Sequence, residues 1–559
     1  MGVNCTFYYD FVYQDFGICK NILLQKHIPI LGVCLGHQGL VFVNGGKIVN
    51  GNPPVHGRLS DVNHHAEGIF EGVPSPFKAV RYHSLKVDKH SLPECLEQIA
   101  WSRNSVDGSD IIMGLKHKDA PIWTVQFHPE SICTEYGPAI IENFVRLAMD
   151  YQSQSPISVG KLPDNLLDIT RIPEPLSTKK VSQDYRVLVK PLLDVFVDPE
   201  VVYKHLFSDK HVSFWLDSAK IEAGRSRYSY MGDACGSNSF HIQYSTKSKI
   251  ITKRSSHEEI VQQIKLEQNG TLFRWVSDFM QSINVSSSNV EFCTGGNADF
   301  PFKGGLVGYF GYEMKAESLR IHESGIRNMQ TSSFQTTSAE ETPDAAFIFA
   351  NRVVIYDHFL KQMYLSVLYQ ETDKEEQMEW SESVFKTIRA LTEIELDENI
   401  AVAQSAAKID PNWMQLSHNR EQYLRNIETA LDKINQGETY EVCLTTRLTK
   451  SIGSSHAHPF EFYQTLRRSN PAPYGGFMSF GKGLFLASSS PERFLQCDDE
   501  NWIWMKPIKG TVSVATEANF GGPTENLKQE NERRCHLLAT NEKDRSENLM
   551  VIKLFSRFG

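Results

Sequence analysis

The clearest hydrophobic pattern near the start of the chain is a short apolar run from Ile28 to Val33, after which glycines recur. A continuous apolar run of this length is typical of a strand buried on both faces, as in a parallel sheet. Further short apolar runs and glycines follow over residues 15–148. The pattern predicts an α/β domain in this part of the chain.

The pattern changes twice after this region. About residues 151–184 are polar and punctuated by prolines, which predicts an interdomain linker. From Tyr185 to Asp357, strand-like runs alternate with turns, and the run from Ala346 to Tyr356 is the clearest. Residues 185–357 are therefore expected to be rich in strands.

A helix and a strand are predicted next. The apolar residues Tyr423, Ile427, Ala430, Leu431 and Ile434 recur with a helical period, so they share one face. Gly437 stands where a helix C-terminal cap belongs. From Tyr440 to Leu448, side chains alternate in character, which predicts a strand with two distinct faces.

Composition limits the classes of partner. A chain of 559 residues is too long for one core and predicts two or three domains. The 67 acidic residues outnumber the 57 basic ones and give a net charge of −10, which argues against nucleic acid as a partner. No stretch approaches the roughly 20 continuous apolar residues that a membrane span needs. We therefore expect neither a nucleic-acid nor a membrane partner.

Cys34 carries the first candidate chemistry. It follows the apolar run and has Gly32 and Gly36 two positions away on either side, which suits a tight strand-to-helix turn. Such a turn exposes the sulfur, and the helix N-terminus stabilises a thiolate. His128 follows another apolar run, with Glu130 two residues later to orient its imidazole. These residue types together indicate a Cys-His-acid triad.

The stretches GVCLGHQ, RYHSL and FHPES resemble the class I glutamine amidotransferase family. The resemblance implies that Cys34, His128 and Glu130 form the triad and that residues matching Gln38, Ser84 and Leu85 hold the substrate L-glutamine. It also implies a mostly parallel sheet with helices on both faces and Cys34 at the carboxyl end of a strand. His83, in the same stretch, is expected to be structural.

One departure concerns the start of this domain. Family members begin with a strand and a glycine-rich loop that contributes to the oxyanion hole, and residues 1–14 match neither. The sequence therefore predicts that the opening strand and half of the oxyanion hole are missing.

Three later stretches also carry chemistry: SSSPERF around Glu492, PIKGT around Lys509, and EKDRSENLM around Glu547. Singly, they fit a turn, a surface lysine and a solvated helix face. Together and in this order they resemble the chorismate-utilising enzymes. With the amidotransferase first, the order resembles the bifunctional aminodeoxychorismate synthase family. The resemblance implies an α+β fold with an antiparallel sandwich-like core and helices outside.

The resemblance also implies roles. The amine of Lys509 attacks C2 of chorismate, Glu492 is the general acid for the departing hydroxyl, and Thr511 binds substrate. A lysine attacks only as the neutral amine, so burial or a neighbouring cation must favour loss of its proton. Relatives bind Mg²⁺ with a carboxylate matching Glu547, supported by Asp544 or Glu542. The region 215–229 resembles a tryptophan-binding region.

The resemblance divides the chain into an amidotransferase domain at 15–150, a linker at 151–184, an N-terminal synthase part at 185–400 and a chorismate-binding domain at 412–559. Motifs expected after residue 550 are not in the sequence, so we expect a chain truncated at both ends. The expected activity is glutamine-dependent conversion of chorismate to 4-amino-4-deoxychorismate in p-aminobenzoate and folate synthesis. The alternatives are anthranilate synthesis, against which Lys509 speaks, and a non-catalytic truncated product or binding partner. A plastid is expected for a plant protein and the cytoplasm otherwise, with no transit peptide visible.

Overall fold

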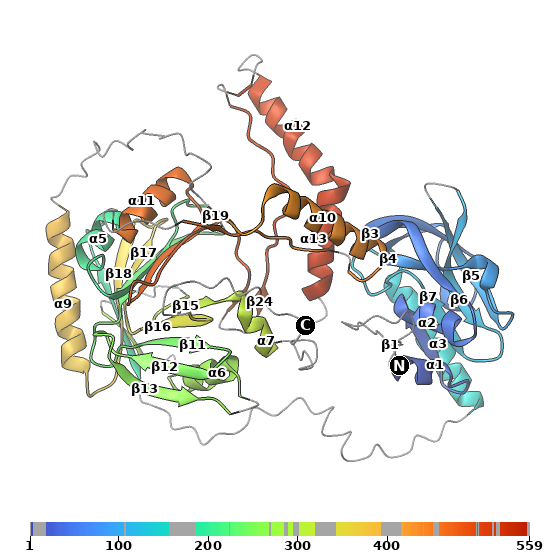
Figure 1. Cartoon of the computed structure of the whole chain (residues 1–559), viewed down its shortest axis with the longest axis horizontal. Helices are drawn as coiled ribbons and strands as arrows, with labels where there is room; N and C mark the ends of the chain where they lie inside the picture. The colour runs from blue at the N-terminus through green and yellow to red at the C-terminus, as the bar shows by residue number, and fades with distance from the viewer. Residues whose placement is uncertain are drawn as a thin grey trace. The chain divides into compact units, whose positions relative to one another are not determined.

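The chain forms two compact units in the computed structural model (Figure 1). Unit 1 comprises Met1–Arg171, Asp410–Ser451 and Pro507–Gly559, and unit 2 comprises Ile172–Ile409 and Ile452–Lys506. The units differ from the predicted segments 185–400 and 412–559, because two strands near the end of the chain pair into the main sheet of unit 2. The structure describes residues 2–3, 18–104, 108–155, 185–222, 224–267, 270–283, 285, 289–293, 301–318, 342–392, 415–439, 441–450, 458–498, 500, 502–516, 519–520 and 526–555.

Unit 1 contains a seven-stranded sheet with the order β1-β2-β7-β6-β5-β3-β4. The pairs β1–β2 and β2–β7 are parallel, and the other four are antiparallel. The predicted α/β class is confirmed, but the sheet is mixed rather than mostly parallel. An apolar run indicates a buried strand without fixing its direction, which depends on the connections. The strands are β1 Gly2–Val3, β2 Ile30–Val33, β3 Ile48–His64, β4 Phe77–Val87, β5 Leu96–Arg103, β6 Asp110–His117 and β7 Ile122–Val125.

Helices cover both faces of this sheet. Ile30 of β2 packs in a hydrophobic cluster with Leu23 of α1 and Leu40 of α2, whereas Leu31 packs in another with Ile140 of α3. Successive strand residues point to opposite faces, so α1 and α2 lie on one face and α3 lies on the other. The helices are α1 Ile18–Leu23, α2 Leu35–Val43 and α3 Gly137–Gln154, with short 3₁₀ turns η1 Gly68–Phe70 and η2 Lys89–Ser91. Most of the predicted linker, residues 156–184, lies outside the described residues.

The start of the sheet differs from the prediction that the opening strand is missing. The two-residue strand β1 pairs in parallel with β2, with Gly2 opposite Leu31 and Val3 opposite Gly32. Residues 4–17 lie outside the described part of the chain. A strand edge pairs through main-chain groups, whatever the side chains of the added backbone are. A strand of two residues therefore leaves no side-chain pattern that the sequence could reveal.

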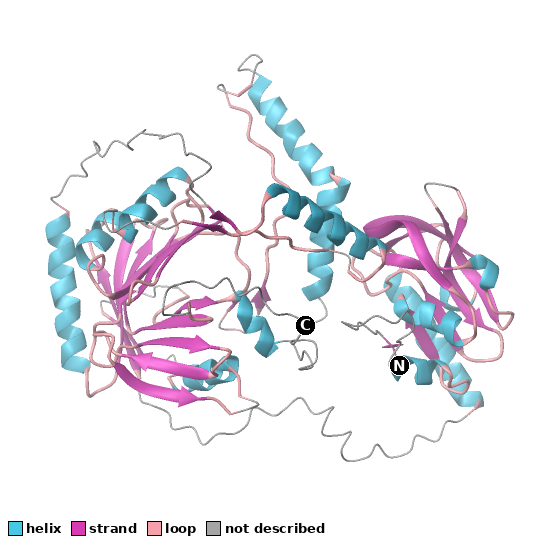
Figure 2. Cartoon of the chain, in the orientation of Figure 1, coloured by secondary structure: helices cyan, strands magenta, loops and turns pink. Residues whose placement is uncertain are grey.

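Unit 2 is a sandwich of two sheets (Figure 2). The larger has eight strands in the order β14-β8-β18-β17-β10-β9-β21-β22, and the smaller has five in the order β13-β12-β11-β16-β15. All described pairings in these two sheets are antiparallel except β14–β8. The strands are β8 Arg186–Leu192, β9 Val212–Asp217, β10 Tyr228–Asp233, β11 His241–Ser245, β12 Ile250–Arg254, β13 Ile260–Lys265, β14 Val290–Phe292, β15 Gly305–Phe310, β16 Ala345–Ala350, β17 Arg352–Asp357, β18 Gln362–Tyr369, β21 Tyr474–Phe480 and β22 Phe485–Ser490, with a separate pair β23 Gln496–Cys497 and β24 Ile503–Trp504.

Two hydrophobic clusters use opposite faces of the larger sheet. Val353 and Ile355 of β17 belong to the cluster between the sheets, whereas Val354 and Tyr356 belong to the cluster under the outer helices. This confirms the predicted sandwich-like core with helices outside. The helices of unit 2 are α5 Pro199–Leu206, α6 Leu272–Ser282, α7 Lys315–Ser318, α9 Lys374–Leu391 and α11 Pro459–Ser469, with the 3₁₀ turn η4 Tyr312–Met314.

The outer helix α9 is amphipathic. It buries Gln377, Ser381, Val384, Ile388 and Leu391.

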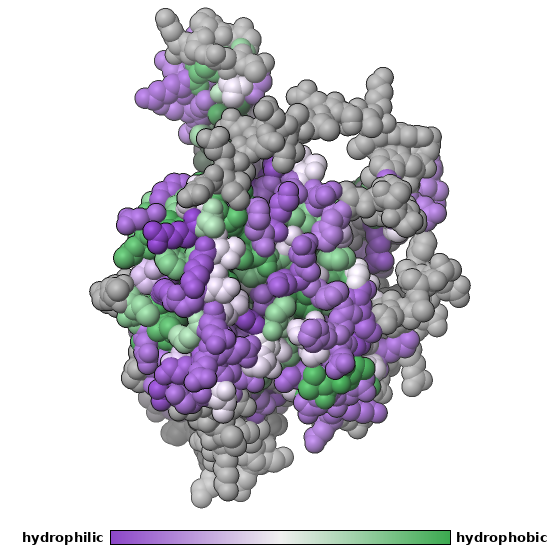
Figure 3. Space-filling view, turned by 90° about the vertical axis from the view of Figure 1, so that its left-hand side faces the viewer, coloured by the Kyte–Doolittle hydropathy of each residue, from purple (hydrophilic) through white to green (hydrophobic). Residues whose placement is uncertain are grey.

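The face of the molecule shown in Figure 3 is mostly hydrophilic with small hydrophobic areas. No helix in the described part of the chain has the length and apolar character to cross a membrane.

The later segments of unit 1 are mainly helical. They contain α10 Arg420–Asn435, α12 Leu527–Thr540 and α13 Glu542–Phe555, with the short strands β19 Gln415–Leu416 and β20 Leu448–Thr449. The predicted helix is confirmed as α10. The side chain of Asn419 caps its start by accepting from Gln422 N, and Gly437 follows its end with a φ of +82°. Leu424 and Leu431 on this helix are exposed.

The predicted strand from Tyr440 to Leu448 is wrong for the residues described. Only Leu448 and Thr449 form a strand, opposite Leu416 and Gln415. Residues 441–447 are almost all exposed, and Tyr440 lies outside the described residues. Alternation shows that a segment could have two faces, but a strand also needs a neighbouring backbone, which here extends for two residues.

Candidate active site

Cys34 lies on a strained turn between β2 and α2. Its φ is 51° and its ψ is −93°, a conformation that non-glycine residues rarely adopt and that often marks functional sites. Its N–H donates to Val125 O at 2.8 Å, which fixes the turn to β7. A Cβ at Gly32 would lie 2.7 Å from Thr124 Cγ2 and 3.0 Å from the carbonyl carbon of Gly36, so only glycine fits there.

His128 and Glu130 lie at the same edge of the sheet as Cys34. β2 and β7 are parallel neighbours with Val33 opposite Val125, so the residues that follow them meet at their carboxyl ends. His128 is buried, and its Nδ1 is 2.8 Å from Glu130 Oε1. This contact orients the imidazole and leaves Nε2 as the nitrogen that can exchange a proton with a thiol.

The structure adds Gln126, which no sequence motif assigned to the site. Its side-chain amide donates to Cys34 Sγ at 3.6 Å and is completely buried. Its Oε1 accepts from Gln38 Nε2 at 3.3 Å, and Gln38 also donates to Leu85 O at 2.9 Å. The only sequence signal for Gln126 was its place two residues before His128. These contacts connect the predicted glutamine-binding residues to the thiol.

Ser84 is bonded to two distant parts of unit 1. Its hydroxyl donates to Ile434 O at 2.9 Å, in the last turn of α10. The same oxygen is 2.9 Å from His56 Nε2, and since its proton is already donated, this nitrogen must be the donor. The predicted glutamine-binding residue is therefore held from β3 and from α10.

Buried histidines surround these residues in their neutral form. Burial lowers the pKa of His37 to about 3, although a hydrogen bond with Thr124 opposes the shift. Burial, followed by the charge of Arg81, lowers the pKa of His83 well below its ordinary value. His83 Nδ1 is 2.9 Å from Leu85 O, so this nitrogen carries the proton and donates. The contact fits the expected structural role of His83.

We expect the stability of unit 1 to fall as the pH drops from near 7 to near 5. His37 has a folded pKa of about 3 against 6.5, so below pH 6.5 the unfolded chain takes up a proton that the folded chain does not. Each pH unit in this window then costs about 1.4 kcal/mol for this residue. Urea unfolding at several pH values measures the slope. His37→Asn, which keeps a polar partner for Thr124, should flatten it, and an unchanged slope would contradict the assignment.

Lys509 lies beside a carboxylate. Its Nζ is 3.3 Å from Glu441 Oε1, and its side chain is 27% exposed. The next residue, Gly510, has a φ of +72°, and a Cβ there would lie 2.4 Å from Asp544 Oδ2. The structure thus gathers Lys509, Glu441 and Asp544 in unit 1. The sequence led us to expect a cation beside Lys509 or deep burial of its amine, and the structure instead places the anion Glu441 there. The motif around Lys509 could not reveal this neighbour, because Glu441 is far away in the sequence.

Glu492 and Thr511 are both exposed. β22 ends at Ser490, and Ser490 Oγ donates to the main-chain oxygen of Glu492 at 3.0 Å. Glu492 belongs to unit 2, whereas Lys509 and Thr511 belong to unit 1. The predicted chorismate-site residues are therefore divided between the two units.

Asp544 and Glu547 lie one turn apart near the start of α13. Lys543 Nζ is 3.7 Å from Glu547 Oε1 and would compete with a bound cation. Among the described residues, no group of three or more His, Cys, Asp or Glu could hold a metal ion. Two carboxylates fit the small protein share of a Mg²⁺ shell, which usually keeps several waters. The Mg²⁺ site remains a prediction.

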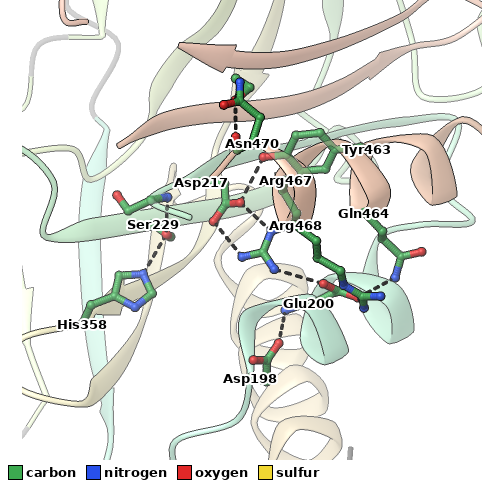
Figure 4. A network of polar contacts seen from close by, with 12 residues as sticks. Asp198, Glu200, Asp217, Ser229, His358, Tyr463, Gln464, Arg467, Arg468 and Asn470 are labelled. Carbon is green, nitrogen blue, oxygen red and sulfur yellow. Dashed lines mark hydrogen bonds and ion pairs between the residues drawn. The ribbon is translucent and has the colours of Figure 1, made fainter. Parts of the chain in front are cut away.

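The region predicted to bind tryptophan is packed against protein partners. Trp215 is fully buried in the cluster under the outer helices. Ser218 Oγ donates to Tyr228 O at 2.7 Å, and Asp217 accepts from Arg467 at 2.8 Å. Figure 4 shows Asp217 with Arg467 in a network of polar contacts. The side chains that suggested a ligand bond to or pack against other residues of the chain, so a tryptophan partner is not supported.

Two family descriptions match the chain. Glutamine amidotransferase class-I matches residues 14–148, and chorismate binding enzyme matches residues 237–557. The first range contains Cys34 and His128, and the second contains Glu492 and Lys509. The order of the two matches agrees with the resemblance seen in the sequence.

Similar proteins match nearly the whole chain. It is 32% identical over 543 residues to aminodeoxychorismate synthase of Streptomyces griseus, covering 97% of this chain and 67% of the relative. It is 31% identical over 655 residues to the chloroplastic aminodeoxychorismate synthase of Arabidopsis thaliana, with the same coverage. Anthranilate synthase component 2 of Methanothermobacter marburgensis is 45% identical over 135 residues, covering 24% of this chain and 66% of that protein. The chain belongs to the aminodeoxychorismate synthase family, with an amidotransferase segment followed by a chorismate-binding segment.

Proposed function

We propose that this chain acts in the glutamine-dependent amination of chorismate to 4-amino-4-deoxychorismate, a step towards p-aminobenzoate and folate. The observation that carries the proposal is the group at the ends of β2 and β7, where Gln126 contacts the Cys34 thiol and Glu130 orients His128. Membership of the family indicates chorismate as the acceptor of ammonia, and Lys509 favours amination at C4 over amination at C2. The proposed compartment is the plastid for a plant protein, since the Arabidopsis relative is named chloroplastic, and the cytoplasm otherwise.

The amidotransferase step needs a thiolate and a proton carrier. Cys34 Sγ attacks the side-chain carbonyl carbon of glutamine, and His128 takes the thiol proton and gives it to the departing ammonia. The resulting thioester is hydrolysed to glutamate by a water that His128 activates. The side-chain amide of Gln126 donates to the sulfur at 3.6 Å and favours a negative charge on it.

The developing oxyanion needs N–H donors. The N–H of Cys34 donates to Val125 O and cannot serve. In strand-to-helix nucleophile turns, the N–H of the residue after the nucleophile is a donor. The proposal therefore assigns the N–H of Leu35, at the start of α2, to the oxyanion.

The acceptor step would use the roles that the family resemblance implies. The Lys509 amine attacks C2 of chorismate, Glu492 protonates the departing C4 hydroxyl, and ammonia then attacks C4 and releases the lysine. Glu441, 3.3 Å from Lys509 Nζ, can take the proton that the lysine must lose before it attacks. Thr511 would contact the substrate. Asp544 and Glu547 would hold Mg²⁺, which when bound offsets the carboxylate charge of chorismate.

The test supplies the purified chain with glutamine, chorismate and Mg²⁺, and measures glutamate and the aminated products separately. Glutamate together with 4-amino-4-deoxychorismate is expected. Glutamate without an aminated product would restrict the proposal to the amidotransferase step. No glutamate would contradict it.

Anthranilate synthesis is the second candidate, because the amidotransferase segment also matches an anthranilate synthase component. Lys509 argues against it, since direct addition of ammonia at C2 needs no lysine. We expect Lys509→Ala to lower 4-amino-4-deoxychorismate formation by at least about a hundredfold, the effect of losing a covalent catalyst. Lys506→Ala is the matched control, because Lys506 Nζ donates to the main-chain oxygen of Gly224 at 3.2 Å. Anthranilate as the product of the unaltered chain would favour the second candidate.

A further inference from the structure

The last turn of α10 contacts the predicted glutamine-binding residues. Ser84 Oγ donates to Ile434 O at 2.9 Å across 350 positions of sequence. Ile434 also accepts main-chain N–H bonds from Gln436 and Gly437, which end the helix. The contact therefore joins the amidotransferase segment to a helix of the segment that matches the chorismate-binding family, and both belong to unit 1.

Gly437 allows this close approach. Its φ is +82°, and a Cβ built there would lie 3.1 Å from Leu85 Cγ and 3.4 Å from Ser84 Cβ. The first distance is tighter than ordinary van der Waals contact, so a side chain at residue 437 would have to push Leu85 away. The turn thus packs directly on the pair Ser84–Leu85.

A chain of hydrogen bonds runs from this pair to the thiol. Leu85 O accepts from Gln38 Nε2 at 2.9 Å, and Gln38 also donates to Gln126 Oε1 at 3.3 Å. Gln126 in turn donates to Cys34 Sγ at 3.6 Å. Leu85 is thus linked through Gln38 to Gln126, whose amide contacts the nucleophile.

We propose that the end of α10 and the turn that follows it, Ile434 to Gly437, position the glutamine site, with Gly437 as a positioning residue. The inference rests on the proposed amidotransferase step and deepens it. Glu441, the partner of Lys509, follows Gly437 four positions later in the chain. The segment that matches the chorismate-binding family thereby completes the glutamine site of the amidotransferase segment.

The decisive variant is Gly437→Ala, and its matched control is Gly45→Ala. Gly45 also follows the end of a helix, has a φ of +91° and has no atom within 4 Å of an added Cβ. Both variants place alanine at a positive φ, but only Gly437→Ala meets Leu85. We expect Gly437→Ala to lower kcat/KM for glutamine hydrolysis roughly ten- to a hundredfold, mainly through KM, and Gly45→Ala to stay within about twofold.

Labelling of Cys34 distinguishes positioning from general damage. The glutamine analogue 6-diazo-5-oxo-L-norleucine reports on the glutamine site, whereas iodoacetamide reports on the thiol alone. Gly437→Ala should slow labelling by the analogue and leave alkylation by iodoacetamide as in Gly45→Ala. Equal analogue labelling of the two variants would overturn the inference. No analogue labelling of the unaltered chain would contradict the proposed function itself, and the inference with it.

A second variant keeps the inference testable if Gly437→Ala does not fold. Ser84→Ala removes the hydroxyl that holds Ile434 O, and Ser84→Thr keeps a hydroxyl. Hydrogen exchange in the last turn of α10 should be faster in Ser84→Ala and close to that of the unaltered chain in Ser84→Thr. Unchanged exchange in Ser84→Ala would count against the contact.

Discussion

Replacing Cys34 by alanine is expected to lower glutamine hydrolysis by at least about a thousandfold, the usual scale for loss of a catalytic nucleophile. The sulfur is the atom that must form the bond to the substrate, and the turn that presents it is fixed by its N–H bond to Val125 O. Alanine has the same Cβ, so the strained backbone at residue 34 is preserved while the chemistry is removed. Glutamate release measured by a coupled dehydrogenase assay gives the rate.

Cys95→Ala is the control for this variant. Cys95 lies in the same segment, and its thiol is 3.5 Å from Asn44 Oδ1 rather than beside the proposed triad. It should hydrolyse glutamine within about twofold of the unaltered chain. Substantial hydrolysis by Cys34→Ala, or equal losses in the two variants, would show that Cys34 is not the nucleophile.

The second large effect is on stability, in the polar network of Figure 4. Arg467 of α11 donates to Asp217 of β9 at 2.8 Å and to Glu200 of α5 at 3.0 Å. The side chains of Asp217 and Glu200 are only 1% and 9% exposed. Burial opposes the charge on Arg467, but its bonds to Asp217 outweigh this and raise its pKa. The guanidinium is therefore held charged between two buried carboxylates.

We expect Arg467→Met to destabilise unit 2 by about 3–5 kcal/mol, because the variant leaves a buried carboxylate without its cation. Hydrogen exchange of β9 and α11 measures the loss within this unit. Arg274→Met is the matched control: Arg274 pairs with Asp278 on α6, both are nearly half exposed, and its loss should cost less than about 1 kcal/mol. Similar losses in the two variants would mean that the buried network adds no stability.

The sequence alone predicted the features that depend on nearby residues. The turn around Cys34, the neighbouring His128 and Glu130, and the helix over Tyr423 to Ile434 with its cap Gly437 all follow from local patterns, since backbone conformation and short spacing decide them. The family motifs added the predicted roles of Lys509 and Glu492, which stay predictions. These features could be read before any tertiary contact was known.

Only the tertiary structure decided what depends on distant residues. The strand predicted from Tyr440 failed because strands need a neighbour that no local pattern supplies. Tertiary folding also paired Asp217 with Arg467 and placed the amide of Gln126 beside the Cys34 thiol. The hydrogen bond from Ser84 to Ile434 spans 350 positions, so no spacing in the sequence could predict it. The sequence thus determined the chemical groups and their local geometry. Their partners were decided by the fold, because hydrogen bonds and ion pairs depend on distances in space that sequence separation does not set.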